Sequence, residues 1–256
     1  MTVIDPHAPR PSLLLALLEG RAVLEAGASI LTKPLYKSFP RGDGHPVMVL
    51  PGFGTSDLAT APLRSFIRQR GYHVYPWRHG VNLGNNREVR NKLHEKIANI
   101  VQKHGQPISL VGWSLGGIIS RHLAFRHPER IRCVITLGSP FYGAPDSTNI
   151  TVLLNLARKL TGKDALGTPK RAPQTHLEPA VPVPFSSVYS KTDGVVAWQT
   201  CLEREAPLRE NIHVPCSHIG FGFNPLVRYI IAERLAQPAG QWKPFEIEGI
   251  RKLVYA

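Results

Sequence analysis

Residues 108–117 read Ile-Ser-Leu-Val-Gly-Trp-Ser-Leu-Gly-Gly, and this stretch decides the fold of the chain. Its first four residues predict a short buried strand, and an apolar helical pattern begins at Leu115. Between the two lies G-x-S-x-G, a motif that holds a serine on a sharp turn between strand and helix. The turn has room only where the flanking positions lack side chains. It lifts the Ser114 hydroxyl to a helix N-terminus, where the helix dipole favours negative charge. The stretch therefore predicts a nucleophilic serine at the carboxyl end of a strand.

The chain on either side alternates short apolar runs with longer amphipathic segments. Strands are predicted over 46–50, 72–77, 107–111, 131–137, 185–189 and 211–214. Helices are predicted over 12–32, 61–70, 88–104, 115–126 and 225–235. This alternation is typical of βαβ units, so we expect an α/β fold with a mostly parallel sheet of about six strands and helices on both faces. We expect residues 1–256 to form a single domain.

Two segments stand outside this alternation. Residues 1–45 form an N-terminal helical extension, whose helix at 12–32 is expected to turn Glu19, Arg21 and Glu25 towards water. Residues 141–184 contain no strand pattern but hold an apolar helix at 150–160 and then a proline-rich stretch. A connection of this length in a compact domain usually has a function, so a lid insertion is the interpretation, with a plain surface excursion as the alternative.

A serine hydroxyl needs a base, and the base needs a carboxylate that orients it. In the G-x-S-x-G architecture these follow in the order serine, acid, histidine. The aspartates after Ser114 are Asp146, Asp164 and Asp193. Asp193 directly follows the strand at 185–189, so it lies at the carboxyl end of a strand, where open α/β sheets build their sites. We therefore predict that Asp193 is the acid.

The same order selects one of the histidines that follow Ser114. They are His122, His127, His176, His213 and His218. The first two lie on the helix behind the serine, the third in the predicted lid, and the fourth inside a strand. His218 lies in the loop after that strand, from which an imidazole can reach over the sheet. His218 is therefore the predicted base.

Backbone N–H groups must stabilise the oxyanion of an acyl-transfer intermediate. One is predicted to be the N–H of Leu115, directly after the serine. The other is predicted to be the N–H of Phe53, in the glycine-containing loop 50–54 after the first strand. The alternative is that the glycines of this loop only make a turn between strand and helix.

Together these segments resemble the α/β-hydrolase superfamily, and within it the bacterial lipase and esterase branch. The likeness runs from residue 46 to residue 235. The matching segments are LPGFG at 50–54, GWSLGG at 112–117, GSPFYG at 138–143, YSKTDGVV at 189–196 and SHIGFGFNP at 217–225. The family usually has His-Gly in the first segment, where this chain has Pro51-Gly52. Only a backbone N–H is needed there, so the implied role survives the change.

The resemblance and the predicted triad imply hydrolysis of carboxylic esters through an acyl-enzyme on Ser114, with no cofactor and no metal. Apolar side chains near the site segments favour an ester with an acyl chain. The predicted substrate-binding residues are Trp113, Phe141, Leu153, Leu156, Trp198 and Phe221. Three alternatives stay open: thioesterase or amidase chemistry, phospholipase chemistry, and a non-catalytic binding protein on the same fold.

Composition limits the other classes of function. The chain has 256 residues, of which 43% are hydrophobic and 19% charged, and this excludes a disordered or collagen-like chain. Its 31 Lys and Arg against 18 Asp and Glu give a net charge of +13. The basic residues are scattered, so the expected partner is a small-molecule or lipid ester and not nucleic acid, while peripheral contact with an anionic membrane stays open.

The location of the protein is predicted from the signals that the sequence displays. No signal peptide or membrane-spanning run is visible, and the cysteine count of 3 is odd, so a cytoplasmic location is expected. A bridge between Cys201 and Cys216, a removed leader and the oligomeric state are all left open.

Overall fold

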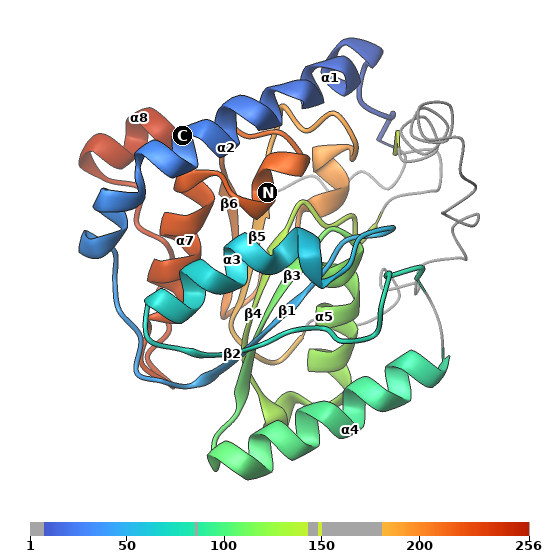
Figure 1. The fold of residues 1–256 in the computed structure, drawn as a ribbon, viewed down its shortest axis with the longest axis vertical. Coiled ribbons are helices and arrows are strands. Elements are labelled where there is room, and N and C mark those ends of the chain that lie inside the picture. The colour runs from blue at the N-terminus through green and yellow to red at the C-terminus, as the bar shows by residue number, and fades with distance from the viewer. Residues whose placement is uncertain (1–7, 85–86, 143–147, 150–180, 256) are drawn as a thin grey trace.

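The structure is a computed structural model, and it describes residues 8–84, 87–142, 148–149 and 181–255 (Figure 1). Within these residues six strands form one sheet in the order β2-β1-β3-β4-β5-β6. The strands are β1 (Pro46–Leu50), β2 (His73–Tyr75), β3 (Ile108–Trp113), β4 (Ile131–Leu137), β5 (Phe185–Tyr189) and β6 (Arg209–His213). Every neighbouring pair runs parallel, which confirms the predicted α/β class and the six-stranded sheet.

Parallel strands that helices cover on both sides are mostly apolar, and β1 and β3 follow this pattern. All residues of β1 and β3 are buried. Strand β3 runs two residues further than predicted, to Trp113, because Gly112 pairs with Leu50 on one side and Thr136 on the other. The pairing therefore carries the chain without interruption to the residue before Ser114.

Four long helices cover the sheet (Figure 1). Residues of α3 (Asp57–Gln69) and α7 (Pro225–Leu235) pack in one apolar core, and residues of α4 (Arg87–His104) and α5 (Leu115–Arg126) pack in a second. Helix α3 begins four residues earlier than predicted, because the Ser56 hydroxyl caps it by accepting the N–H of Leu58. The shorter helical elements are α1 (Leu13–Leu17), η1 (Leu18–Arg21), α2 (Ala22–Leu31), η2 (Lys33–Ser38), η3 (Pro128–Arg130), η6 (Trp198–Cys201), η7 (Ile219–Gly222), η8 (Gly249–Arg251) and α8 (Lys252–Tyr255).

The N-terminal helical segment is present, but its predicted orientation is wrong. Figure 1 shows α1 and α2 running along one end of the molecule. Glu19, expected in water, is 3% exposed, whereas Leu17 and Leu24 are 77% and 75% exposed. The segment turns its charged side inward because backbone N–H groups of two loops need acceptors, and the carboxylates of Glu19 and Glu25 supply them.

Two further expectations concern the predicted lid and the cysteines. The predicted lid at 141–184, with its helix at 150–160, lies largely outside the described residues. Thr148, which the structure does describe, forms an antiparallel bridge with Val196. Cys201 and Cys216 are both buried free thiols, and Cys133 is also free, so the bridge that the sequence left open does not form here.

Candidate active site

Ser114 sits on a strained turn between β3 and α5. Its backbone has φ 52° and ψ −118°, a conformation that L-residues rarely adopt. The surrounding hydrogen bonds hold it there: its N–H donates to Leu137 O at 2.8 Å, and its carbonyl accepts the N–H of Gly117 at 2.9 Å. Strain of this kind costs about 1–3 kcal/mol and persists where neighbours determine the backbone. The turn places Ser114 at the N-terminus of α5, as the motif predicts.

The glycines of the motif are required by close backbone contacts. A Cβ on Gly112 would lie 2.4 Å from Gly117 Cα, and a Cβ on Gly116 would lie 2.3 Å from Leu50 O. Real Cβ atoms do not approach other atoms so closely. Only glycine therefore lets helix α5 meet both its own strand and neighbouring β1 at this point.

The loop after β1 lies directly against this turn. A Cβ on Gly52 would be 3.4 Å from Ser114 Cβ, so the loop and the serine are in van der Waals range. Buried Asn82 braces the loop. Its side-chain amide donates to Pro51 O at 2.7 Å, and its backbone carbonyl accepts the N–H of Gly54 at 2.8 Å. The role of Asn82 was not predicted, because a lone asparagine in a loop gives no signal in the sequence.

The two predicted oxyanion donors are close to the serine in the chain or in space. Among the hydrogen bonds of the described residues, none takes the N–H of Phe53 or of Leu115. Both groups therefore have donor capacity left for a ligand oxygen.

Asp193 lies in the turn after β5 and is almost fully buried. Its Oδ1 accepts the N–H groups of Val195 and Val196, each at 2.8 Å. Its Oδ2 lies 2.7 Å from Nδ1 of His218. One oxygen thus fixes the carboxylate in its own turn, and the other orients the imidazole.

His218 lies in the loop after β6, and its environment shifts its titration. Burial lowers the pKa of the His218 imidazole, but the charge of Asp193, the hydrogen bond to Asp193 and the charge of Glu19 outweigh burial and raise the pKa above its usual value. The ring packs edge-on against Phe221, with 6.1 Å between ring centroids. Aromatic and carboxylate contacts together hold the ring in one orientation.

Ser114 and His218 both lie beside the end of β4. Leu137 O accepts the Ser114 N–H, and a Cβ on the next residue, Gly138, would lie 3.1 Å from Nδ1 of His218. Trp113 joins them as well, because its Nε1 donates to His218 O at 3.1 Å. No hydrogen bond among the described residues joins the Ser114 hydroxyl to the imidazole. Such contacts often tighten only when substrate binds, so the arrangement is compatible with a nucleophile and its base.

A buried carboxylate from the N-terminal segment braces both loops of the acid and the histidine. Glu19 Oε1 accepts the N–H of Gly194 at 2.8 Å and that of His218 at 2.9 Å, and Oε2 accepts the N–H of Ile219 at 3.0 Å. Glu19 thus holds the backbone of His218 itself and of the residue that follows Asp193. Nothing in the local sequence marks Glu19, because its partners lie almost the whole chain away.

Two neighbours of Glu19 extend the same brace. Glu25 Oε1 accepts the N–H of Ser217 at 2.8 Å, and Glu25 Oε2 accepts from the Asn224 amide at 3.0 Å. Arg21 donates to the carbonyl of Thr192 at 2.6 Å and to its hydroxyl at 2.7 Å. Three charged side chains of η1 and α2 therefore hold the turn after β5 and the loop after β6.

The other predicted residues lie in several places. Trp113 borders the His218 loop, Phe221 belongs to the core beneath α3 and α7, and Phe141 belongs to the core beneath α5. Trp198 stacks on Tyr189 with 5.6 Å between ring centroids. Leu153 and Leu156 lie outside the described residues. So do three residues that the sequence offered as alternatives to Asp193 and His218, which are Asp146, Asp164 and His176.

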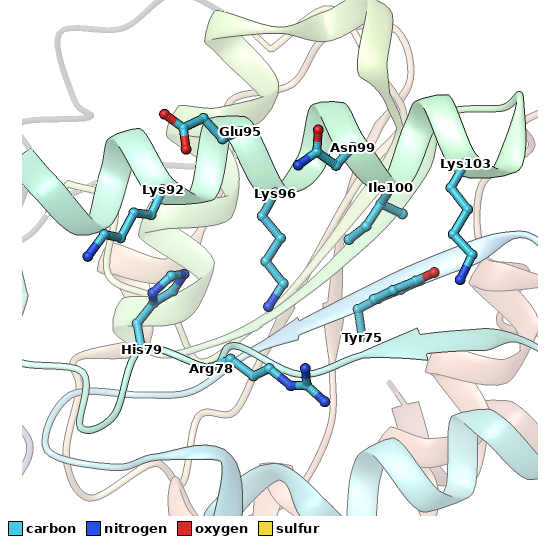
Figure 2. Close-up of a pocket in the computed structure, with 9 residues that line it drawn as sticks. All are labelled: Tyr75, Arg78, His79, Lys92, Glu95, Lys96, Asn99, Ile100 and Lys103. Carbon is cyan, nitrogen blue, oxygen red and sulfur yellow. The ribbon is translucent and has the colours of Figure 1, made fainter.

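A separate hollow of about 450 Å³ opens between β2 and α4 (Figure 2). Figure 2 shows Lys92, Lys96 and Lys103 of α4 on one side and Arg78 and His79 of the loop after β2 on the other. Burial lowers the pKa of Lys96 to about 8, and its ammonium donates to the Pro76 and Trp77 carbonyls. None of the predicted site residues lines this hollow. In the described part of the chain, no group of three His, Cys, Asp or Glu is arranged to hold a metal ion.

A family model described as the alpha/beta hydrolase fold matches residues 46–198. A pimeloyl-[acyl-carrier protein] methyl ester esterase of Shewanella woodyi is 28% identical over 101 residues, which are 38% of this chain and 37% of that protein. The enzyme of the same name from Aeromonas hydrophila is 35% identical over 98 residues, which are 38% of this chain and 28% of that protein. The alignments thus span about a third of the length of these relatives.

Comparison with solved structures shows the same fold. Aspergillus fumigatus lipase B superposes with a TM-score of 0.54 and 16% identity over 80% of this chain and 56% of that chain. The monoacylglycerol lipase of Paleococcus ferrophilus superposes with a TM-score of 0.55 and 15% identity over 77% of this chain and 96% of that chain. These superpositions establish the fold of the chain. Because the sequence identities are low, the activity must be argued from the site.

Proposed function

The chain belongs to the α/β-hydrolase fold family, and from that premise we propose that it is a serine hydrolase that cleaves carboxylic esters through an acyl-enzyme intermediate. The observation that carries the proposal is the buried pair of Asp193 and His218, with 2.7 Å between Oδ2 and Nδ1, beside a serine on a strained strand-to-helix turn. A structural histidine needs no such serine, and a structural serine needs no positive φ.

Each residue of the proposed triad has one task. Nε2 of His218 takes the Ser114 proton as the hydroxyl oxygen attacks the ester carbonyl, and the same proton is then given to the leaving alcohol. Asp193 keeps the proton of the imidazole on Nδ1 and stabilises the imidazolium. Water then attacks the acyl-enzyme, with His218 again as the base, and releases the carboxylic acid and Ser114.

The oxyanion of both tetrahedral intermediates is proposed to bind the N–H groups of Phe53 and Leu115. The first is held by the loop that Asn82 braces, and the second stands at the N-terminus of α5. Both donors are fixed before substrate arrives, so little reorganisation is needed when charge develops.

The substrate class is proposed to be an ester with an apolar acyl group. The matched relatives are named as methyl ester esterases, and the superposed structures include two lipases. The acyl group is proposed to contact the aromatic residues at the site and Leu153 and Leu156 of the predicted lid. Thioester, amide and phospholipid substrates on the same triad are distinguished by comparing their kcat/KM values with those of carboxylic esters.

A fluorophosphonate probe tests the proposal directly. The native protein should be labelled on Ser114, as mapped by peptide mass spectrometry, and should hydrolyse para-nitrophenyl esters. The heat-denatured protein is the matched control and should not be labelled. Ser114→Ala should lose labelling and reduce kcat by several orders of magnitude. A native protein that is neither labelled nor active on any ester would favour a non-catalytic binding role.

A further inference from the structure

The N-terminal segment, residues 13–35, exposes a row of leucines. We call this row the apolar stripe, and it consists of Leu13, Leu17, Leu24, Leu31 and Leu35. Leu13 and Leu17 lie four residues apart in α1, and Leu24 and Leu31 lie seven residues apart in α2, so each pair shares one face of its helix. Leu35 follows in η2. Leu17, Leu24 and Leu31 are 77%, 75% and 82% exposed. Isolated exposed leucines are ordinary, but five exposed leucines within residues 13–35 form a concentration of apolar surface that is typical of an interaction site.

The same segment exposes almost no charge between its ends. From Ser12 to Thr32 the charged residues are Glu19, Arg21 and Glu25, and all three are used to hold the loops of the candidate active site. A helix on the surface of a monomer in water normally has the opposite arrangement, with apolar residues inward and charges outward. The charges of this segment hold it to the protein, so the leucines are left for a partner.

Cationic side chains border the apolar stripe. Residues 8–42 contain five basic residues and two acidic ones, and both acidic residues turn into the protein. Arg10 lies before the stripe, Lys33 and Lys37 lie near its end, and Arg41 follows, all exposed. A row of leucines with cations at its margins matches the surface of a bilayer that contains anionic lipid, where apolar side chains enter the interface and cations stay with the headgroups.

We propose that the apolar stripe binds the surface of an anionic phospholipid bilayer, with the segment 13–35 lying flat in the interface. The segment does not span the membrane in this proposal: no helix that the structure describes is long and apolar enough for that. The polar side of the segment touches the loops after β5 and β6, so the bilayer lies near the edge of the sheet where Ser114 also stands. The proposal goes beyond ester hydrolysis and does not depend on it.

Vesicle binding tests the proposal without any measurement of activity. The full chain is sedimented with vesicles of phosphatidylcholine that contain about a third phosphatidylglycerol, and with vesicles of phosphatidylcholine alone. Binding should be stronger to the anionic vesicles and should weaken as salt increases. The variant L17S/L24S/L31S should bind at least tenfold more weakly to both, because the inserted apolar area is lost. Leu58→Ser, which removes a leucine of similar exposure on α3, is the control and should bind as the parent does.

A second pair of variants separates this surface from general basicity. K33Q/K37Q removes two cations beside the apolar stripe, and K92Q/K103Q removes two from the hollow on α4, at the opposite end of the molecule (Figures 1 and 2). The first pair should weaken binding to anionic vesicles roughly tenfold, whereas the second should leave it nearly unchanged. Leu24→Trp should show a blue shift of its fluorescence when vesicles are added, relative to the parent.

Three results would overturn the proposal. The first is binding of L17S/L24S/L31S equal to that of the parent, with both proteins shown to be folded by thermal unfolding. The second is equal loss of binding in K33Q/K37Q and K92Q/K103Q, which would show attraction by total charge. The third is a parent protein that is dimeric without lipid and becomes monomeric in L17S/L24S/L31S, because the stripe would then bind a second copy of the chain.

Discussion

The carboxylate of Glu19 accepts the backbone N–H of His218 at 2.9 Å, across 199 residues of sequence. The same oxygen accepts the N–H of Gly194, the residue after Asp193. A carboxylate that binds beside both members of an acid–histidine pair fixes their separation and adds negative charge near the imidazole. Glu19 therefore has two separable effects on the site, one on geometry and one on electrostatics.

The activity of the parent protein should depend on pH through His218. The pKa of His218 is raised because the charge of Asp193, its hydrogen bond and the charge of Glu19 outweigh burial. A general base must be neutral, so kcat/KM should fall as pH falls through this raised pKa. We expect the midpoint of the acid limb to lie above the ordinary histidine value of about 6.5. A midpoint below that value, measured with a para-nitrophenyl ester, would contradict the assignment of His218 as the base.

Glu19→Gln should move this acid limb to lower pH, because it removes one of the charges that raise the pKa of His218. The amide keeps one acceptor oxygen, so the brace is only partly lost. Glu25→Gln is the matched control: Glu25 accepts the N–H of neighbouring Ser217 but does not contribute to the pKa of His218.

The two variants distinguish positioning from packing. If Glu19→Gln and Glu25→Gln lower the melting temperature alike and both leave the acid limb in place, Glu19 has only a structural role. A change in the limb confined to Glu19→Gln identifies it as a positioning residue that acts through His218.

Replacement of the histidines should separate the proposed base from its neighbours. His218→Ala should reduce kcat/KM by about a thousandfold or more, as is usual for a residue that transfers a proton in each step. His213→Ala removes a ring of β6 that packs near Tyr189 of β5, and His122→Ala removes a ring on α5, so both should keep most of the activity. Loss of activity in His213→Ala together with an active His218→Ala would reverse the assignment.

The backbone contacts at the serine turn should make Gly116 irreplaceable. An added Cβ would lie 2.3 Å from Leu50 O, so Gly116→Ala must push α5 away from β1 and should cost about 1–3 kcal/mol of unfolding free energy. Gly27→Ala is the matched control, because an added Cβ there meets nothing within 4 Å. It should leave stability unchanged or raise it by about 0.5–1 kcal/mol, since alanine loses less backbone entropy in a helix. Urea unfolding of both variants measures the contrast, and equal stabilities would show that the turn adapts.

Much of the fold could be predicted because it is written in local patterns. The inner strands β1 and β3 are short, mostly apolar runs, which is the pattern that a strand buried on both faces leaves. The bounds of β1, β4 and β5 agree with prediction to the residue. The relation of Ser114 to its strand and helix is also local, because G-x-S-x-G is required by contacts within a few residues.

The predictions that were wrong or missing concern side chains whose hydrogen-bond partners are distant in the sequence. The helical period of residues 12–32 was visible, but a period identifies two faces without saying which of them is buried. Charged residues were assigned to water, as is usual, whereas Glu19 and Glu25 face inward to accept N–H groups of loops near residues 194 and 218. The role of Asn82 was not predicted for the same reason, because its hydrogen-bond partner Pro51 is 31 residues away.

A buried ion pair outside the proposed triad can be used to test how charge stabilises the fold. Glu203, 1% exposed, accepts from Arg121 Nε of α5 and from Tyr142, each at 2.8 Å, and lies 3.2 Å from Arg209 of β6. Burial raises the pKa of Glu203, but the charge and hydrogen bond of Arg121, the hydrogen bond of Tyr142 and the charge of Arg209 outweigh it and lower the pKa. The stabilising charge is therefore fully present above the pKa of the unfolded chain and is lost as pH falls through the lower pKa of the folded state.

Glu203→Gln should therefore destabilise the protein strongly at neutral pH. The substitution removes the negative charge that pairs with the buried guanidinium groups of Arg121 and Arg209, and breaking a buried pair from one side costs about 3–5 kcal/mol. The difference from the parent should shrink as pH falls below the ordinary glutamate pKa and through the lower pKa of folded Glu203, where the parent carboxylate becomes protonated as well. Glu88→Gln, which breaks an exposed pair with Lys92, is the control and should change stability little at either pH. Urea unfolding at neutral and acid pH measures both variants, and a constant difference across this range would show that the charge of Glu203 does not stabilise the fold.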